Sequence, residues 1–299
     1  MNTKESGKLF LSVIIGIVGC GVGLSLFHEI LSEFWMSIIQ YAVIFLITIF
    51  FFFKSKNKGA EFFGFHKFNP QLIPFVILYG LMIIPITILI GGFFNQIFYN
   101  PLEASYGTLI DWKITISALI IAPILEEMLF RGAIFNGLKK DNKIQKAILI
   151  SSLLFALYHC NITQFFYTFV CALFFAILAE ASRCIWTSII VHFMFNFAGI
   201  FGDSFIGYLY SNILDGKISL NTHTFMIISI LIWLGVGVLL LFLSFKVLKK
   251  IKILSGKMDS QISNKENVCY NKRPLPSSMV SGIVICCIII VINLVSNLF

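Results

Sequence analysis

A few ionisable or strongly polar residues lie inside otherwise apolar stretches of this sequence. They are Glu126, Glu127, Arg131, His159, His192 and Asn196, with Glu180 near the end of one stretch, where it is expected at the membrane interface. A charge at the centre of a bilayer costs about 2.5 to 3.5 kcal/mol on insertion scales, so such residues find partners and mark functional sites. Carboxylates, imidazoles and a carboxamide can together activate a water molecule and stabilise an oxyanion. This is the chemistry of hydrolysis.

The spacing within the first stretch separates the two carboxylates. Glu127 and Arg131 are four residues apart, so on a helix they share a face and can form an ion pair that offsets the cost of burial. Glu126 lies about 100 degrees away around the helix and is left free for chemistry. Pro123 removes a backbone donor one turn earlier, which predicts a kink beside the carboxylates that could admit water.

Two further pairs show the same spacing of four residues. His192 and Asn196 place an imidazole and a carboxamide on one helix face, and Phe155 precedes His159 by one turn. If these helices pack together, their polar side chains converge with Glu126. The sequence therefore predicts a polar catalytic cavity between the central helices.

Three motifs in this region resemble those of CPBP proteins, the family of CAAX proteases and bacteriocin-processing proteins. Residues 126–131 fit the EExxxR motif, residues 155–159 fit FxxxH and residues 192–196 fit HxxxN. The resemblance covers roughly Ile114 to Asp203. It implies an intramembrane endopeptidase that cleaves a membrane-associated peptide or protein.

The chemistry of peptide hydrolysis suggests a role for each polar residue, and the assignment resembles the glutamate-protease mechanism of this family. Glu126 takes a proton from water, and His159 holds that water or later protonates the leaving amine. His192 and Asn196 donate hydrogen bonds to the oxyanion. Structural support is expected from Glu127, Arg131 and Phe155.

A metal-dependent mechanism would use nearly the same residues. Glu126, His159 and His192 also make a possible zinc-binding set, because catalytic zinc is held by His and carboxylate ligands. The sequence contains no HExxH helix, the usual source of such ligands. We therefore expect no cofactor, with zinc as the alternative.

The composition requires a membrane protein. The chain has 299 residues, 58% of them hydrophobic and only 12% charged, whereas soluble domains carry roughly 25% charged residues. Apolar runs long enough to cross a bilayer predict an all-α, polytopic transmembrane bundle of about eight or nine spans. The expected spans cover residues 9–31, 34–53, 72–94, 114–138, 147–159, 164–179, 185–208, 225–245 and 279–298. The fifth and sixth are short for a full crossing.

The net charge of +8 comes from lysine clusters beside apolar runs. Such clusters are typical of cytoplasmic loops, so they indicate membrane topology and no nucleic-acid partner. An N-terminus in the cytoplasm places the clusters at 54–67, 139–146 and 246–273 on the inside. We expect a multi-pass protein of the cell membrane, in contact with lipid.

The motifs divide the chain into three parts. Residues 1–104 are expected to be N-terminal transmembrane helices, 105–210 the catalytic core, and 211–299 the C-terminal helices with a polar linker near 255–278. Two other functions remain open. One is a non-catalytic membrane regulator or a bacteriocin self-immunity protein. The other is a transporter, which is less favoured because the sequence lacks internal repeats.

Overall fold

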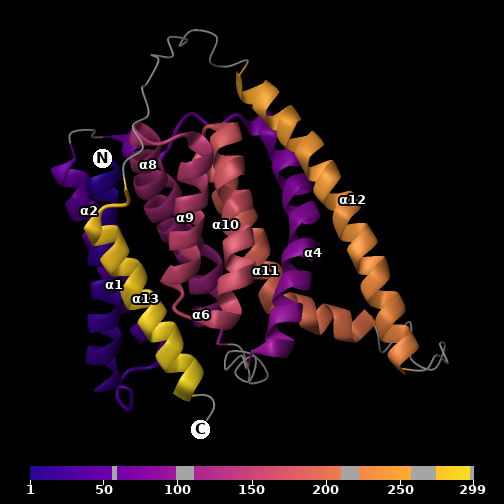
Figure 1. Ribbon diagram of the computed structural model, residues 1–299, viewed down its shortest axis with the longest axis horizontal. Coiled ribbons are helices and arrows are strands. Elements are labelled where there is room, and N and C mark those ends of the chain that lie inside the picture. Colours follow the sequence, from indigo (N-terminus) through magenta and orange to yellow (C-terminus); the bar gives the residue numbers. More distant parts are fainter. Residues whose placement is uncertain (56–58, 99–110, 210–221, 257–273, 297–299) are drawn as a thin grey trace.

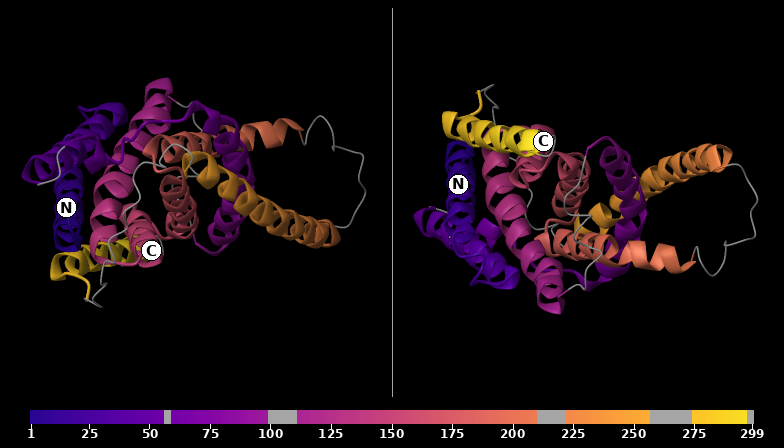
Figure 2. Two further views of the ribbon diagram at one scale, coloured as in Figure 1. Left: turned by 90° about the horizontal axis from the view of Figure 1, so that it is seen from above. Right: turned by 90° about the horizontal axis from the view of Figure 1, so that it is seen from below.

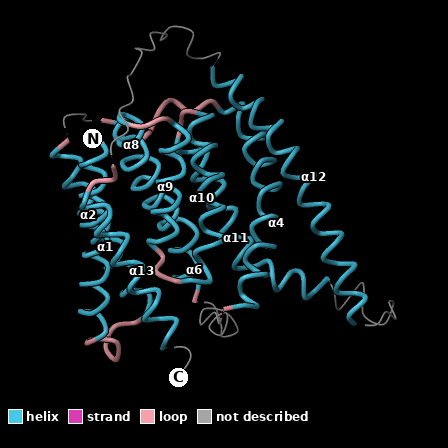
Figure 3. Tube along the Cα trace, in the orientation of Figure 1, coloured by secondary structure: helices cyan, strands magenta, loops and turns pink. Residues whose placement is uncertain are grey.

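The protein forms a bundle of helices, seen in the computed structural model of Figure 1. The structure describes residues 1–55, 59–98, 111–209, 222–256 and 274–296. Throughout these ranges the regular structure is helical and contains no strand, as the tube view of Figure 3 shows. The prediction of a polytopic helical bundle is confirmed. The linker expected near 255–278 falls mostly outside the described residues.

Each predicted span corresponds to a helix or a series of helices. The elements are α1 (Thr3–Ser25), α2 (Glu33–Lys54), α3 (Ala60–Phe63), η1 (Pro70–Leu72), α4 (Ile73–Ile97), α6 (Trp112–Ile116), η2 (Ser117–Ile121), α7 (Ala122–Glu127), η3 (Met128–Phe135), α8 (Asn136–Asp141), α9 (Ile144–Tyr158), α10 (Ile162–Ser182), α11 (Ile185–Leu209), α12 (Thr222–Gly256) and α13 (Ser277–Ser296).

Six stretches of the described residues are long and apolar enough to cross a membrane. They are Thr3–Ser25, Glu33–Lys54, Pro70–Asn95, Ile162–Ser182, Ile185–Gly202 and Ser277–Ser296. The sixth predicted span is longer than its apolar run suggested, because α10 continues to Ser182. The fifth remains short, since α9 has only 15 residues. At about 1.5 Å per residue, α9 falls short of a full crossing.

The helices pack around two hydrophobic cores. One core joins α1, α2 and α13 to η3 and α9, and the other joins α4, α10, α11 and α12. In Figure 1, α1, α2 and α13 lie to the left, α9 and α10 in the centre, and α4 and α12 to the right. The views along the bundle in Figure 2 show α12 leaning away from the other helices. The central helices are therefore covered from both sides.

The segment that carries the two glutamates is not a uniform α-helix. Two π-helical stretches, η2 and η3, flank the short helix α7. The backbone N–H of Ala122 bonds to the carbonyl of Ser117, five residues back, immediately before Pro123. Wider turns of this kind occur frequently at functional sites. The irregularity expected from Pro123 is thus present as a π-helical stretch.

A tight turn places His159 between two helices. His159 is the C-cap residue of α9, and Cys160 follows with a φ of 49°, in the left-handed region that often ends helices. The Asn161 side chain then accepts hydrogen bonds from the backbone N–H groups of Thr163 and Gln164, which begins α10. His159 is therefore held at a fixed point at the end of α9.

Gly132 permits a close approach between two backbone segments near the site. A Cβ atom at this position would lie 2.6 Å from the Phe63 carbonyl oxygen and 2.8 Å from the Phe63 Cα. The short helix α3 thus rests directly on η3. Because the obstructing atoms belong to the backbone, no side-chain rotation can make room for a larger residue.

We therefore predict that Gly132→Ala destabilises the protein by about 1 to 3 kcal/mol, although alanine is the better helix former. Thermal unfolding in detergent measures the effect. Gly199→Ala is the matched control, since a Cβ atom there meets nothing within 4 Å. Equal melting temperatures for the two variants would contradict the close contact.

Candidate active site

A buried ion pair lies at the centre of the polar cluster. Arg131 Nη1 is 2.8 Å from Glu127 Oε1, and both side chains are at most 1% exposed. Arg131 Nη2 also donates to the carbonyl of Ala172 on α10, at 3.1 Å. The spacing of four residues had predicted this pair. Burial of both charges is tolerable because each finds a partner with short hydrogen bonds.

His192 on α11 contacts both carboxylates. Its Nδ1 is 3.0 Å from Glu127 Oε1, and its Nε2 is 3.7 Å from Glu126 Oε2. A carboxylate paired with arginine can only accept, so Nδ1 carries the proton and donates to Glu127. This bond orients the ring and leaves Nε2 facing Glu126. At this separation the two groups form no direct hydrogen bond, and a water molecule beside them can contact both.

Glu126 and Glu127 therefore differ in their surroundings. Glu127 accepts from both Arg131 and His192 through a single oxygen. Glu126 has no direct hydrogen bond within the described part of the chain, and His192 Nε2 lies 3.7 Å from its carboxylate. Glu126 is 8% exposed to solvent, whereas Glu127 is fully buried. Of the two carboxylates, Glu126 is the accessible one.

The ring of Phe155 lies among the charged residues of the cluster. The guanidinium of Arg131 lies 4.5 Å from the ring centroid, which is the distance of a cation–π contact. The imidazoles of His159 and His192 pack against the same ring in edge-to-face geometry, with centroids 5.0 and 5.8 Å away. Phe155 thus holds the two histidines and the arginine at fixed separations.

One ring nitrogen of His159 is already hydrogen-bonded within its own helix. Its Nδ1 lies 2.9 Å from the carbonyl oxygen of Phe155, one turn back on α9. A carbonyl can only accept, so Nδ1 donates and Nε2 of the neutral ring is an acceptor. His159 and His192 therefore each use Nδ1 to fix the ring and keep Nε2 for another partner.

Asn196 connects α11 to the π-helical stretch η2. Its Nδ2 donates to the carbonyl of Ala118 at 2.8 Å. This bond takes one of the two amide N–H groups, so one N–H and the side-chain oxygen remain for other partners. The contact also orients the helix face that His192 shares.

Two tyrosines near Glu126 were not identified from the sequence. Tyr158 on α9 and Tyr41 on α2 both lie close enough to Glu126 to interact with its charge. Tyr158 directly precedes His159 and gave no separate signal. Tyr41 is about 85 residues from Glu126 in the sequence and lies in an apolar span with no motif. Only the packing of α2 against α7 brings it to the site.

The described part of the chain shows no preformed three-ligand cluster at the residues considered for zinc. No group of three His, Cys, Asp or Glu side chains there is arranged to hold one ion. Nδ1 of His159 and Nδ1 of His192 face a carbonyl and a carboxylate, respectively. We therefore derive no step that passes through a metal.

Comparison with known proteins identifies this region. Residues 108–198 match the family model "Type II CAAX prenyl endopeptidase Rce1-like". The CPBP resemblance is confirmed. A Bacillus subtilis (strain 168) protein described as "Putative membrane peptidase YdiL" is 35% identical over 77 residues. That alignment covers 26% of this chain and 32% of the relative. No solved structure matches.

The matched region contains every residue of the predicted site. Glu126, Glu127, Arg131, Phe155, His159, His192 and Asn196 all fall within the matched residues. Tyr41, near Glu126, comes from outside them. The helices that flank this region on both sides therefore contribute packing and one possible site residue.

We predict that Arg131→Met destabilises the protein by about 3 to 5 kcal/mol, because it leaves the buried Glu127 charge without its cation. The double variant Glu127→Gln/Arg131→Met should recover much of this loss. A glutamine is neutral and its oxygen still accepts from His192. Thermal unfolding in detergent compares the variants. A double variant as unstable as Arg131→Met would exclude the uncompensated charge as the cause.

Proposed function

We propose that the protein is an intramembrane endopeptidase that hydrolyses a peptide bond in a membrane-associated peptide or protein. The proposal rests on the different surroundings of the two adjacent glutamates. Glu127 is neutralised by Arg131 and anchors His192, while Glu126 faces His192 Nε2 and remains accessible. The similarity of residues 108–198 to a CAAX prenyl endopeptidase family model, and of part of the chain to a protein described as "Putative membrane peptidase YdiL", supports the same reaction class.

In the proposed reaction, a water molecule lies between Glu126 and the imidazole of His192 or His159. Glu126 takes one proton from this water as the oxygen attacks the carbonyl carbon of the substrate. The carbonyl π bond breaks and its electron pair becomes the oxyanion. The catalytic carboxylate is thereby converted to a carboxylic acid.

Donors on α11 stabilise the oxyanion in this scheme. Asn196 contributes the amide N–H that is not bonded to Ala118, and His192 donates from Nε2 when both ring nitrogens are protonated. Collapse of the intermediate breaks the C–N bond. The leaving amine takes the proton from Glu126 directly or through His159, which returns the carboxylate to its starting form.

The arrangement of the helices supports a cytoplasmic N-terminus. Helix α8, with Lys139 and Lys140, lies at the same end of the bundle as the chain's N-terminus (Figure 1). The C-terminal end of α12, which carries a lysine cluster, lies at this end as well. Basic residues gather on the cytoplasmic side of membrane proteins.

We further propose that catalysis needs no metal.

We predict that Glu126→Gln lowers the rate of peptide cleavage by about 10²- to 10⁴-fold, because a carboxamide cannot take the proton from water. Folding should be unaffected, since Gln is of equal size. The assay uses purified protein in proteoliposomes, a quenched peptide library, and parallel samples with and without a metal chelator. Equal rates in both samples are expected.

Glu33→Gln is the matched control, because Glu33 is exposed in the first turn of α2 and remote from the site. Cleavage by Glu126→Gln at the wild-type rate would rule out the proposed base. Loss of cleavage on chelation, restored by zinc, would instead require a metal-dependent mechanism. Ion flux that depends on Glu126, without cleavage, would favour a transporter.

We also predict that Tyr41→Phe reduces cleavage by about tenfold while leaving the melting temperature near that of the wild type. The substitution removes one hydroxyl dipole close enough to interact with the Glu126 charge, and a tenfold change in rate corresponds to about 1.4 kcal/mol. A pH–rate profile is the decisive measurement, because loss of a polar neighbour shifts the titration of Glu126. Identical profiles for Tyr41→Phe and wild type would exclude Tyr41 from the site.

A further inference from the structure

A cavity of about 380 Å³ lies away from the catalytic cluster, at the end of the bundle where α8 is found. Its lining includes Phe62, His66, Ala133, Asn136, Lys139 and Lys140. None of these residues takes part in the proposed hydrolysis. The volume falls within the range of about 300 to 1,000 Å³ typical of small-molecule sites.

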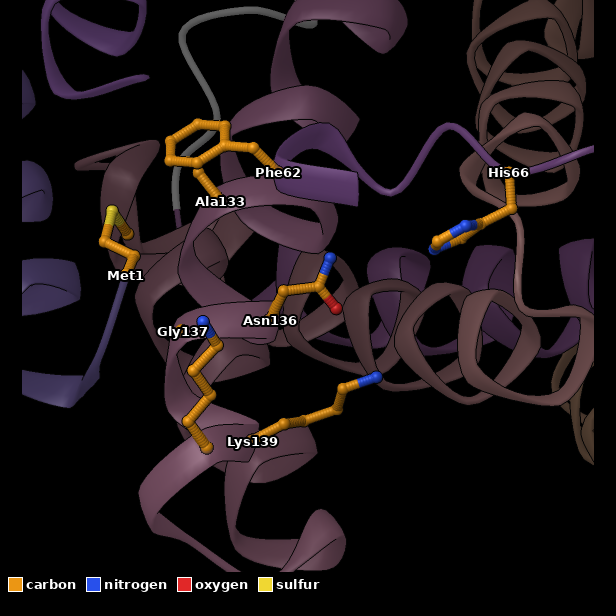
Figure 4. A pocket seen from close by; sticks show the side chains of 8 residues that line it. Met1, Phe62, His66, Ala133, Asn136, Gly137 and Lys139 are labelled. Carbon is orange, nitrogen blue, oxygen red and sulfur yellow. The ribbon is translucent and has the colours of Figure 1, made fainter. Parts of the chain in front are cut away.

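The polar side chains of this cavity supply several hydrogen-bond donors. Figure 4 shows the His66 imidazole and the Asn136 amide pointing toward each other across the space, with Lys139 beside them. Neither His66 nor Asn136 forms a side-chain hydrogen bond to another described residue. These two side chains therefore present unused donors to whatever enters the cavity.

The charge of the cavity is positive. Lys139 is balanced by Glu180 on α10, with an N–O distance of 2.7 Å. Lys140 is exposed and has no acidic partner within the described ranges. The pair Lys139–Glu180 cancels in charge, and the Met1 amine, which also lines the cavity, lies 3.8 Å from the Glu5 carboxylate, so Lys140 is the lining cation without a described acidic partner. A ligand with a single negative charge would balance it.

The backbone around the cavity is fixed before any ligand binds. The Ile185 N–H donates to the Gly64 carbonyl at 3.2 Å, and Cys184 Sγ donates to the His66 carbonyl at 3.3 Å. Burial raises the pKa of the Cys184 thiol, which keeps the proton in that bond. Gly64 has a φ of 72°, which glycine adopts without strain. The turn between α10 and α11 thus holds His66 in place.

The walls of the cavity are partly apolar. Phe62 and Ala133 are both buried, and Phe62 packs edge-to-face against Phe63 and Phe52. A ligand that combines one negative charge with several acceptor oxygens and an apolar body would match these surroundings. Basic pockets between transmembrane helices on the cytoplasmic side bind the headgroups of anionic lipids.

We propose that this cavity binds the phosphodiester headgroup of an anionic phospholipid. The phosphate oxygens accept from Lys140, Asn136 and His66, and the start of the acyl chains lies along Phe62. Since α8 continues the helix that carries Arg131, an occupied cavity would hold the end of the catalytic segment against α3 and α10. The site is independent of whether the cluster around Glu126 hydrolyses peptides.

The test uses the full-length protein in nanodiscs of phosphatidylcholine, with and without phosphatidylglycerol. Native mass spectrometry measures how many phosphatidylglycerol molecules the protein retains, and thermal unfolding measures the stabilisation they give. The wild type should retain phosphatidylglycerol selectively. Lys140→Gln should bind it about tenfold more weakly, because a charge-assisted hydrogen bond is lost.

Lys143→Gln is the matched control, since Lys143 is exposed nearby and does not line the cavity. Equal lipid binding by the Lys140 and Lys143 variants would overturn the proposal, because it would show only a general attraction to basic residues. Stabilisation by inorganic phosphate as strong as that by phosphatidylglycerol would also overturn it, in favour of a site for free phosphate. If Lys140→Gln does not fold, Asn136→Ala provides the same comparison.

Discussion

The buried ion pair between Glu127 and Arg131 is the interaction on which the rest of the site depends. A guanidinium in the apolar interior is unstable without partners on every side. Arg131 takes Glu127 from its own helix, the Ala172 carbonyl from α10 and the Phe155 ring from α9. Glu127 in turn binds His192 of α11. One buried charge thereby fixes the relative positions of four helical segments.

The pair also determines which carboxylate is available for chemistry. Adjacent residues on a helix point in directions about 100 degrees apart, so they cannot share the same partner equally. Arg131 and His192 both bond to Glu127, and this leaves Glu126 without a direct hydrogen bond among the described residues, with His192 Nε2 at 3.7 Å. The neutralised glutamate orients the histidine that faces the free one. Structural support and chemistry are thus divided between two consecutive residues.

The sequence predicted the fold and most of this cluster because the signals were local. Apolar runs located the helices, and the spacing of four residues predicted the contact between Glu127 and Arg131. Contacts between different helices produce no comparable pattern in the sequence. The bond from His192 to Glu127 depends on the rotation of α11, and the approach of Tyr41 depends on how α2 packs. The cavity near Lys140 is lined by the N-terminus, by α3 with the loop after it, and by the end of η3 with α8, which are far apart in the sequence.

The π-helical stretches let the segment that carries Glu126 and Glu127 form hydrogen bonds with α11. A π turn frees a backbone carbonyl from the regular α-helical pattern, which would be costly in an apolar interior without another donor. Asn196 supplies that donor to Ala118, so the irregular backbone before Pro123 is satisfied by the same helix that carries His192. The π-helical backbone of η2 therefore depends on a hydrogen bond from the polar face of α11. Because α11 is bonded to this segment at both Ala118 and Glu127, His192 cannot move away from Glu126 without breaking a buried hydrogen bond.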